Sequence, residues 1–339
     1  MPFMQKFIVV LILCMGAVLI MLSLGQLDQT LKTLRNGDLR YLFPAVVLQA
    51  VWFLVVGFAY HSIYKLLGMK ASLLNLTLLA AAANFVNIVM PMAGVGGVAV
   101  FVNAARKKGQ ASGKVTLAAA LFLLFDQAAF LAVLALGMIV LIRRNDLGAG
   151  EVTAALILLA TASLLATTLY LGTRSAEAMG HFLARLSHLV NLLLRPFLHR
   201  NYLRKERAYE FAREMADGLA ALPARPRGLL LPLFLAFLNK GLLVCILWMI
   251  FLSFGIPYSI GTIIGGFAIG YLFIIVSPTP SGIGVMEGAM ALGLKSLRVD
   301  WHAAVIITLV YRAFTFWLPL AVGGLAFRHL HLGNSAAKS

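Results

Sequence analysis

The sequence contains little charge, few acidic residues and almost no cysteine. Charged residues make up 12% of the 339 residues, whereas hydrophobic residues make up 61%. Soluble domains are about 25% charged and about 45–50% apolar, so a soluble chain could not bury this much apolar surface. A lipid bilayer is therefore the expected solvent. Because the apolar runs are continuous rather than alternating, they predict helices rather than a closed barrel.

Several motifs are absent, and their absence narrows the function. Cys14 and Cys245 both lie in apolar runs, and no CxxC motif or Cys/His cluster predicts a metal or redox site. Walker A, HExxH and GxSxG motifs are missing, so ATP hydrolysis and the common hydrolase centres are not expected. We therefore expect no cofactor and no metal.

The charge that is present is mainly positive, with 28 Lys and Arg residues against 12 Asp and Glu residues. Nucleic-acid binding is one explanation of a basic protein. Basic cytoplasmic loops of a membrane protein explain it better, because most of these charges lie between apolar runs. Residues 172–228 hold ten Lys or Arg and five Asp or Glu, and we expect them to form an amphipathic loop in the cytoplasm.

The apolar runs predict eight membrane spans, since about 20 apolar residues are needed to cross a bilayer. The first run lacks a clear cleavage site and is interpreted as a span rather than a removed signal peptide. The predicted spans are residues 7–24, 43–60, 73–90, 115–142, 152–171, 229–254, 260–276 and 301–327.

Two shorter segments, residues 91–108 and 277–297, are apolar but begin with Pro and Gly. Irregular backbone at membrane depth is stable only where protein or a cavity surrounds it, so we interpret both as broken or re-entrant helices. The expected fold is thus an all-α polytopic membrane protein with about eight spans and two broken segments. The chain has room for one integral membrane domain and no separate soluble domain.

The two broken segments resemble each other at an offset of 187 residues, where Ile88, Val89 and Pro91 match Ile275, Val276 and Pro278. The match predicts an inverted repeat, with repeat 1 at about 73–142 and repeat 2 at about 260–327. Each broken segment either crosses the membrane or turns back on the side it enters. The inverted repeat favours crossing, which places both termini inside, and it is typical of secondary transporters.

Charged residues within the spans are candidates for function, because each costs about 2.5–3.5 kcal/mol to insert. Arg312, which follows Tyr311, lies deep in the last predicted span. A guanidinium binds phosphate or carboxylate through two parallel hydrogen bonds, so Arg312 and Tyr311 predict a site for an anionic headgroup. The alternative is a structural ion pair of Arg312 with Asp126 or Glu287.

A Pro/Gly-rich turn lies at the second break. Pro278 and Pro280 interrupt the helix, and Gly282 and Gly284 allow a tight turn. The helix that restarts near Gly284 would offer free N–H groups to an anion. Glu287, in its first turn, would cap that helix, pair with Arg312 or relay a proton.

Polar residues in other spans have alternative roles. Asp126 is either a proton-coupling carboxylate or, as we favour, a partner of Arg312 or Lys240. Lys240 neutralises Asp126 or binds a headgroup. Asn84 and Asn87 share a helix face, which indicates hydrogen bonding between helices or lining of the site.

Two motifs resemble those of the lysylphosphatidylglycerol synthase transmembrane region, also called the flippase-like family. In the second half they are SPTPSGIGVME at 277–287, with Ser281 in place of a Gly, and LVYRAFTFWLP at 309–319. In the first half MPMAGVGG at 90–97 resembles the family's first turn. The resemblance implies that Pro91, Gly94, Gly96 and Gly97 form the turn of the first repeat. An Arg expected soon after that turn is absent, and Val100 and Phe101 stand there.

The resemblance implies translocation of a lipid or lipid-linked molecule with an anionic headgroup, between the two broken helices, in a bacterial cytoplasmic membrane. The chain ends soon after its last span, so we expect it to lack the aminoacyl-transferase domain of the bifunctional members and to be no enzyme. The expected partners are membrane lipids and an envelope-lipid synthase, and nucleic acid is not among them. The alternatives are an intramembrane lipid-modifying enzyme with Glu287 or Asp126 as base, and a non-catalytic partner of a synthase.

Overall fold

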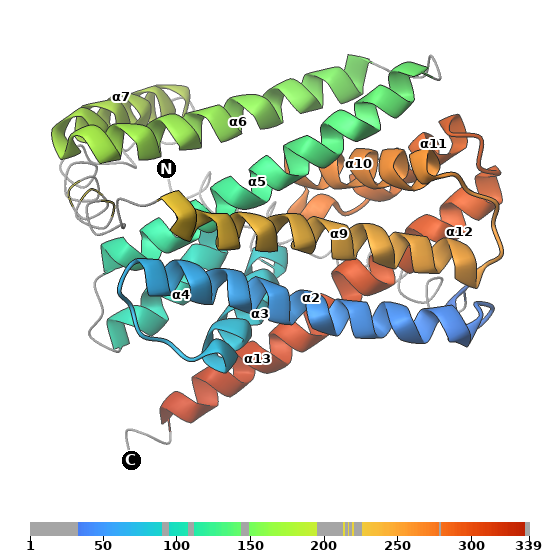
Figure 1. Ribbon diagram of the computed structural model, residues 1–339, viewed down its shortest axis with the longest axis horizontal. Coiled ribbons are helices and arrows are strands. Elements are labelled where there is room, and N and C mark those ends of the chain that lie inside the picture. Colours follow the sequence, from blue (N-terminus) through green and yellow to red (C-terminus); the bar gives the residue numbers. More distant parts are fainter. Residues whose placement is uncertain are drawn as a thin grey trace, which may run out of the picture. The chain divides into compact units, whose positions relative to one another are not determined.

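A computed structural model describes residues 33–89, 95–107, 112–143, 149–194, 226–277 and 279–335, together with residues 213, 216 and 219. All regular structure among these residues is helical, as Figure 1 shows. The predicted all-α fold is therefore confirmed.

Each predicted span except the first corresponds to a helix of the structure. The first, residues 7–24, lies outside the described residues. Among the described residues, five helical runs are long and apolar enough to cross a membrane, and α3 and α10 are shorter apolar helices. The helices are α2 (Leu39–Leu66), α3 (Leu73–Val89), α5 (Ser112–Arg143), α6 (Ala149–Arg174), α9 (Leu230–Ser253), α10 (Ile260–Val276), and the continuous run of α12 (Trp301–Arg312), η3 (Ala313–Trp317) and α13 (Leu318–Ser335).

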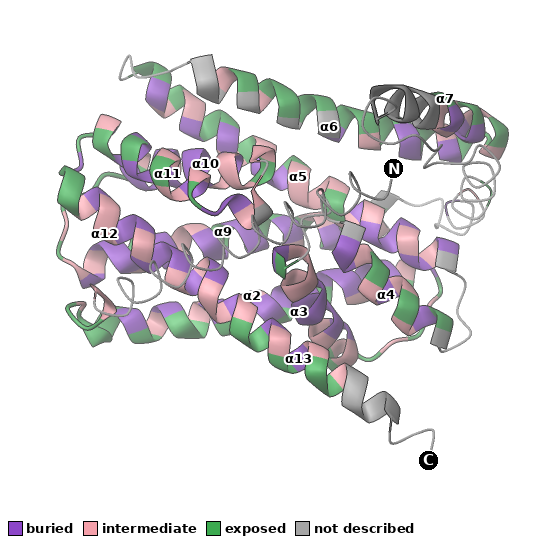
Figure 2. Ribbon diagram, turned by 180° about the vertical axis from the view of Figure 1, so that it is seen from behind, coloured by how far each residue is buried: buried purple, intermediate pink, exposed green. Residues whose placement is uncertain are grey.

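Large apolar side chains on the long helices are exposed, as expected for surfaces that face lipid. Phe43 of α2 is 70% exposed, and Leu156 of α6 is 60% exposed. Figure 2 shows many exposed positions along α6. Since water would disfavour so much exposed apolar surface, these helices belong in a bilayer.

The basic central loop contains a further helix, α7 (Ala176–Leu194). The hydroxyl of Ser175 accepts hydrogen bonds from the backbone N–H groups of Glu177 and Ala178 at 3.2 and 3.3 Å, which caps α7. Met179 is fully buried whereas His181 is exposed, so α7 has one buried and one exposed face. The second part of the loop, residues 203–222, lies almost wholly outside the described residues.

The chain divides into two compact units. Unit 1 comprises Met1–Ala50, Leu134–Val152 and Leu242–Ala321, and unit 2 comprises Val51–Val133, Thr153–Gly241 and Val322–Ser339. The first predicted broken segment belongs to unit 2 and the second to unit 1, so each is described separately.

In unit 2, α3 and α4 (Val95–Lys107) form an antiparallel hairpin. Asn87 contacts Gly97 at its tip, while Leu76 of α3 and Ala105 of α4 line one pocket at its base. The hairpin packs tightly on α13, because a Cβ atom on Gly323 would lie 2.5 Å from the carbonyl oxygen of Ala81. Small residues permit such close helix packing in membranes.

In unit 1, α10, η2 (Pro280–Gly282) and α11 (Val285–Ser296) form a second hairpin. A Cβ atom on Gly266 would lie 2.5 Å from Leu294, and one on Gly270 would lie 3.0 Å from Met290. The glycines therefore allow α10 and α11 to pack closely. In each hairpin the second helix packs back along the first.

The run that follows the second hairpin contains a π-helical turn. Asp300 caps the start of α12 by accepting hydrogen bonds from the N–H groups of His302 and Ala303 at 2.9 and 3.3 Å. The π-helical turn η3 begins directly after Arg312. Such turns often occur at functional sites, because they change the direction of nearby side chains.

Candidate functional site

Arg312 is the centre of a buried polar cluster in unit 1. Its Nε donates a hydrogen bond to Oε1 of Glu287 at 2.7 Å, and its Nη2 donates to the backbone oxygen of Ser281 at 3.2 Å. Its guanidinium lies 4.3 Å from the ring centre of Phe316 in η3. Arg312 is only 3% exposed, so these contacts replace the water that the cation has lost.

Glu287 fulfils two of the predicted roles at once. Its Oε2 accepts a hydrogen bond from the N–H of Gly284 at 2.7 Å, while its Oε1 binds Arg312. Glu287 therefore caps α11 and pairs with Arg312, and the predicted alternative of an Arg312 pair with Glu287 is confirmed. The carboxylate also lies in the first turn of α11, where the helix dipole favours negative charge.

The turn between α10 and α11 is held by hydrogen bonds within itself. The hydroxyl of Thr279 donates to the backbone oxygen of Ile283 at 2.9 Å, and the N–H of Thr279 donates to the hydroxyl of Ser277 at 3.1 Å. Ser281, Gly282 and Gly284 have φ angles of 49°, 73° and 81°, in the left-handed region that favours glycine. Of the two predicted prolines, Pro280 begins η2 and Pro278 lies outside the described residues.

The described residues leave part of the hydrogen-bonding capacity of this cluster unoccupied. A guanidinium has five N–H groups, and bonds to other described residues occupy two of those of Arg312. The Tyr311 hydroxyl is buried, and no hydrogen-bond partner for it is present in the part of the chain that the structure describes. An anionic group could take up the remaining donors.

A second buried ion pair lies in unit 2, between α5 and α9. Lys240 donates a hydrogen bond to Oδ2 of Asp126 at 2.7 Å, and the Nδ2 of Asn239 donates to Oδ1 at 2.8 Å. Lys240 is 1% exposed, which makes neutralisation by Asp126 essential. Of the alternatives for Asp126, pairing with Lys240 is confirmed. The role of Asn239 was not predicted, and only its position next to Lys240 could have indicated it.

Asn87 stabilises the break in the first hairpin. Its Oδ1 accepts a hydrogen bond from the N–H of Gly97 at 2.6 Å, so it satisfies a free donor in the first turn of α4. A Cβ atom on Gly97 would lie 2.5 Å from the Asn87 amide, and one on Gly96 would lie 3.0 Å from Val86. The hydrogen bond predicted for Asn87 is thus confirmed. Asn84 is half-buried, and Pro91 and Gly94 lie outside the described residues.

The two breaks share a feature at equivalent positions of the predicted repeat. Gly97 and Gly284 correspond at the offset of 187 residues, and a side-chain oxygen accepts a hydrogen bond from the N–H of each. The acceptor precedes the glycine in the first hairpin and follows it in the second. Only the second acceptor, Glu287, carries a charge and binds an arginine.

Long apolar helices, two broken hairpins and buried ion pairs define an integral multi-pass membrane protein. The chain belongs to the family described as the lysylphosphatidylglycerol synthase TM region, whose model matches residues 6–323. The predicted family is therefore confirmed over nearly the whole chain.

The relatives that the chain resembles are named only as membrane proteins. The UPF0104 membrane protein PH1989 of Pyrococcus horikoshii is 24% identical over 332 residues, which cover 95% of this chain and 96% of the relative. A UPF0104 membrane protein of Methanothermobacter thermautotrophicus is 33% identical over 94 residues, which cover 27% of this chain and 28% of the relative. Both relatives are archaeal.

Proposed function

We propose that this protein translocates a lipid or lipid-linked molecule with an anionic headgroup, and that Arg312 binds the headgroup. The observation that carries the proposal is a buried arginine, 3% exposed, beside the broken tip of a hairpin. A cation at membrane depth is costly, and its common roles are substrate pathways and structural pairs. The N–H groups of Arg312 that bind neither Glu287 nor Ser281 favour a role in the substrate pathway.

The order of spans along the chain supports alternating access. Between the end of α4 and the start of α10 the described residues contain three candidate spans, Gly113–Arg143, Ala155–Arg174 and Arg227–Ser253. An odd number of spans between two repeats is what an inverted repeat would have. Inverted hairpins with broken helices are typical of secondary transporters.

The ion pairs suggest how the protein would switch. In this conformation Glu287 binds Arg312 within unit 1, and Asp126 binds Lys240 within unit 2. An arriving phosphate would compete with Glu287 for Arg312 and free the carboxylate to accept a proton. Both carboxylates that could act as the base of a lipid-modifying enzyme are neutralised by a cation here, which favours transport over catalysis.

We propose the bacterial inner membrane as the location of the protein. The positive-inside rule favours a cytoplasmic side for the basic loop 172–228. An envelope-lipid synthase that makes the lipid is the expected partner.

The proposal is tested by lipid translocation in proteoliposomes, with phosphatidylglycerol labelled on its acyl chain and a reductant that quenches the outer leaflet. The wild-type protein should accelerate translocation over protein-free vesicles. Arg312→Gln alone would leave Glu287 buried without its cation, so the variant Arg312→Gln/Glu287→Gln is used, and its rate should fall at least about tenfold, as expected when charge-assisted hydrogen bonds are lost. The exposed Arg143→Gln is the control. An unchanged rate in the double variant would overturn the assignment of Arg312.

A further inference from the structure

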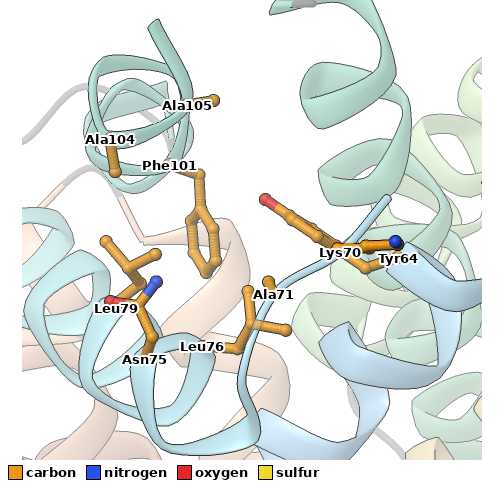
Figure 3. Close-up of a pocket in the computed structure, with 9 residues that line it drawn as sticks. All are labelled: Tyr64, Lys70, Ala71, Asn75, Leu76, Leu79, Phe101, Ala104 and Ala105. Carbon is orange, nitrogen blue, oxygen red and sulfur yellow. The ribbon is translucent and has the colours of Figure 1, made fainter. Parts of the chain in front are cut away.

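A pocket lies at the base of the α3–α4 hairpin in unit 2, at the end opposite the broken tip. It is a shallow pocket that opens to the surroundings, and its space of about 280 Å³ includes the open part. The residues that matter here are Tyr64, Lys70, Asn75, Leu79, Phe101 and Ala104, which we call the basal pocket (Figure 3). None of them belongs to the Arg312 cluster.

The lining of the basal pocket is amphipathic. Leu79 and Phe101 are buried and form an apolar wall, and the small side chain of Ala104 leaves room in front of it. Figure 3 shows the Tyr64 hydroxyl pointing into the space beside Phe101, with the Asn75 amide on the opposite side. Lys70 adds a positive charge from the connection between α2 and α3. An apolar wall next to hydroxyl, amide and ammonium groups suits the junction of a polar headgroup and an acyl chain.

The surroundings of the pocket attract anions. Residues 39–125 contain no Asp or Glu. Six basic residues lie in the connections from α2 to α3 and from α4 to α5 or in the helix turns beside them, namely Lys65, Lys70, Arg106, Lys107, Lys108 and Lys114. Basic residues near a membrane surface attract anionic lipid. No acidic residue in this part of the sequence offsets that attraction.

The pocket lies at the level where the apolar helices end. α2 ends at Leu66, α3 begins at Leu73, and α4 ends at Lys107. Met179 and Leu219 of the central loop pack in one core cluster with Leu67 and Phe101, so that basic loop lies at the same end of unit 2. By the positive-inside rule this end faces the cytoplasmic leaflet.

We propose that the basal pocket binds the phosphate headgroup of an anionic phospholipid of that leaflet. The phosphate accepts hydrogen bonds from Lys70, Asn75 and Tyr64, and the acyl chain follows the apolar wall beside Phe101. The occupant is a lipid rather than free phosphate, because the apolar wall of Leu79 and Phe101 stabilises an acyl chain and adds nothing to the binding of an inorganic ion. The site is separate from Arg312 and exists whether or not the protein transports lipid.

Binding of dioctanoylphosphatidylglycerol to the full-length protein in neutral detergent tests this proposal by calorimetry. All measurements use the Arg312→Gln/Glu287→Gln background, so a second lipid at the Arg312 cluster does not contribute. Lys70→Gln should weaken binding about tenfold or more, as expected for loss of a charge-assisted hydrogen bond. Lys65→Gln is the matched control, because Lys65 is an exposed lysine on the neighbouring turn that does not line the pocket, and its effect should be small.

A second variant tests the cavity itself. Ala104→Trp fills the pocket without changing charge and should weaken binding as strongly as Lys70→Gln, while the thermal unfolding midpoint reports whether each variant folds. Equal losses from Lys65→Gln and Lys70→Gln would show diffuse surface attraction and overturn the proposal. So would binding of inorganic phosphate or of dioctanoylphosphatidylcholine with the affinity of the phosphatidylglycerol.

Discussion

At the scale of single residues, two ion pairs are buried or partly buried within the described part of the protein. Arg312 with Glu287 and Lys240 with Asp126 each form a short ion pair, in unit 1 and unit 2 respectively. The pairs differ in their surroundings. Arg312 bonds a turn and an aromatic ring, whereas Asp126 bonds Asn239 of the same neighbouring helix as Lys240. We therefore expect the first pair to open for a ligand and the second to remain closed.

Because the ion pair of Asp126 and Lys240 is expected to stay intact, their substitutions should show a large coupling free energy in unfolding. Lys240→Met should lower the free energy of unfolding by about 3–5 kcal/mol, because it leaves a carboxylate without its cation inside the membrane. The double variant Asp126→Asn/Lys240→Met should recover most of that loss, since no charge is left and Asn239 can still bond the new amide. Unfolding in mixed micelles titrated with sodium dodecyl sulfate measures both. Additive losses in the double variant would contradict the pairing.

Ser281 predicts a stabilising substitution. It adopts φ 49° and ψ 26°, a left-handed conformation that is unfavourable by about 1–2 kcal/mol for a residue with a Cβ atom. Ser281→Gly should raise the unfolding free energy by about 0.5–1 kcal/mol, after the greater flexibility of glycine in the unfolded chain is subtracted. Gly282→Ala should act in the opposite direction, because φ is 73° there and the new Cβ would lie 3.0 Å from Ile274. Destabilisation by Ser281→Gly would contradict this account.

At the scale of helices, glycines set how closely the hairpins pack with their neighbours. Gly266 and Gly270 hold α10 against α11, and Gly323 holds α13 against α3. Water does not drive helices together within a bilayer, so close van der Waals contact must do so. A methyl group separates the two helices where the facing atom belongs to the backbone, as at Gly323.

Two adjacent glycines of α13 provide a matched test of that packing. A Cβ atom on Gly323 would lie 2.5 Å from the backbone oxygen of Ala81, which can move only with α3. Gly323→Ala should therefore destabilise the protein by about 1–3 kcal/mol, the usual effect of overpacking. Gly324→Ala would place its Cβ at an ordinary 3.4 Å from the Phe85 ring, so its thermal unfolding midpoint should stay close to that of the wild type. Equal effects of the two variants would argue against this contact.

At the scale of the whole molecule, the sequence predicted the elements better than their contacts. Apolar run length located the spans, and Pro and Gly in MPMAGVGG and SPTPSGIGVME located both hairpin tips, because these residues interrupt helices wherever they occur. The partner of Asp126 could be narrowed to two residues but not chosen, since Lys240 lies 114 residues away in the sequence. Likewise, no sequence pattern showed that the amide of Asn87 would bond Gly97 across a break. Such contacts depend on tertiary packing.

The central claim is that Arg312 selects an anionic headgroup during translocation. It is tested most directly by the ratio of initial translocation rates for acyl-labelled phosphatidylglycerol and phosphatidylcholine in the same proteoliposomes. For the wild type the ratio should be about ten or more, the factor expected from charge-assisted hydrogen bonds to a phosphate left unscreened by a headgroup cation. In Arg312→Gln/Glu287→Gln the ratio should fall to about one, because the variant cannot form these charge-assisted hydrogen bonds to the headgroup. A wild-type ratio near one, or a ratio that the double variant preserves, would contradict the account.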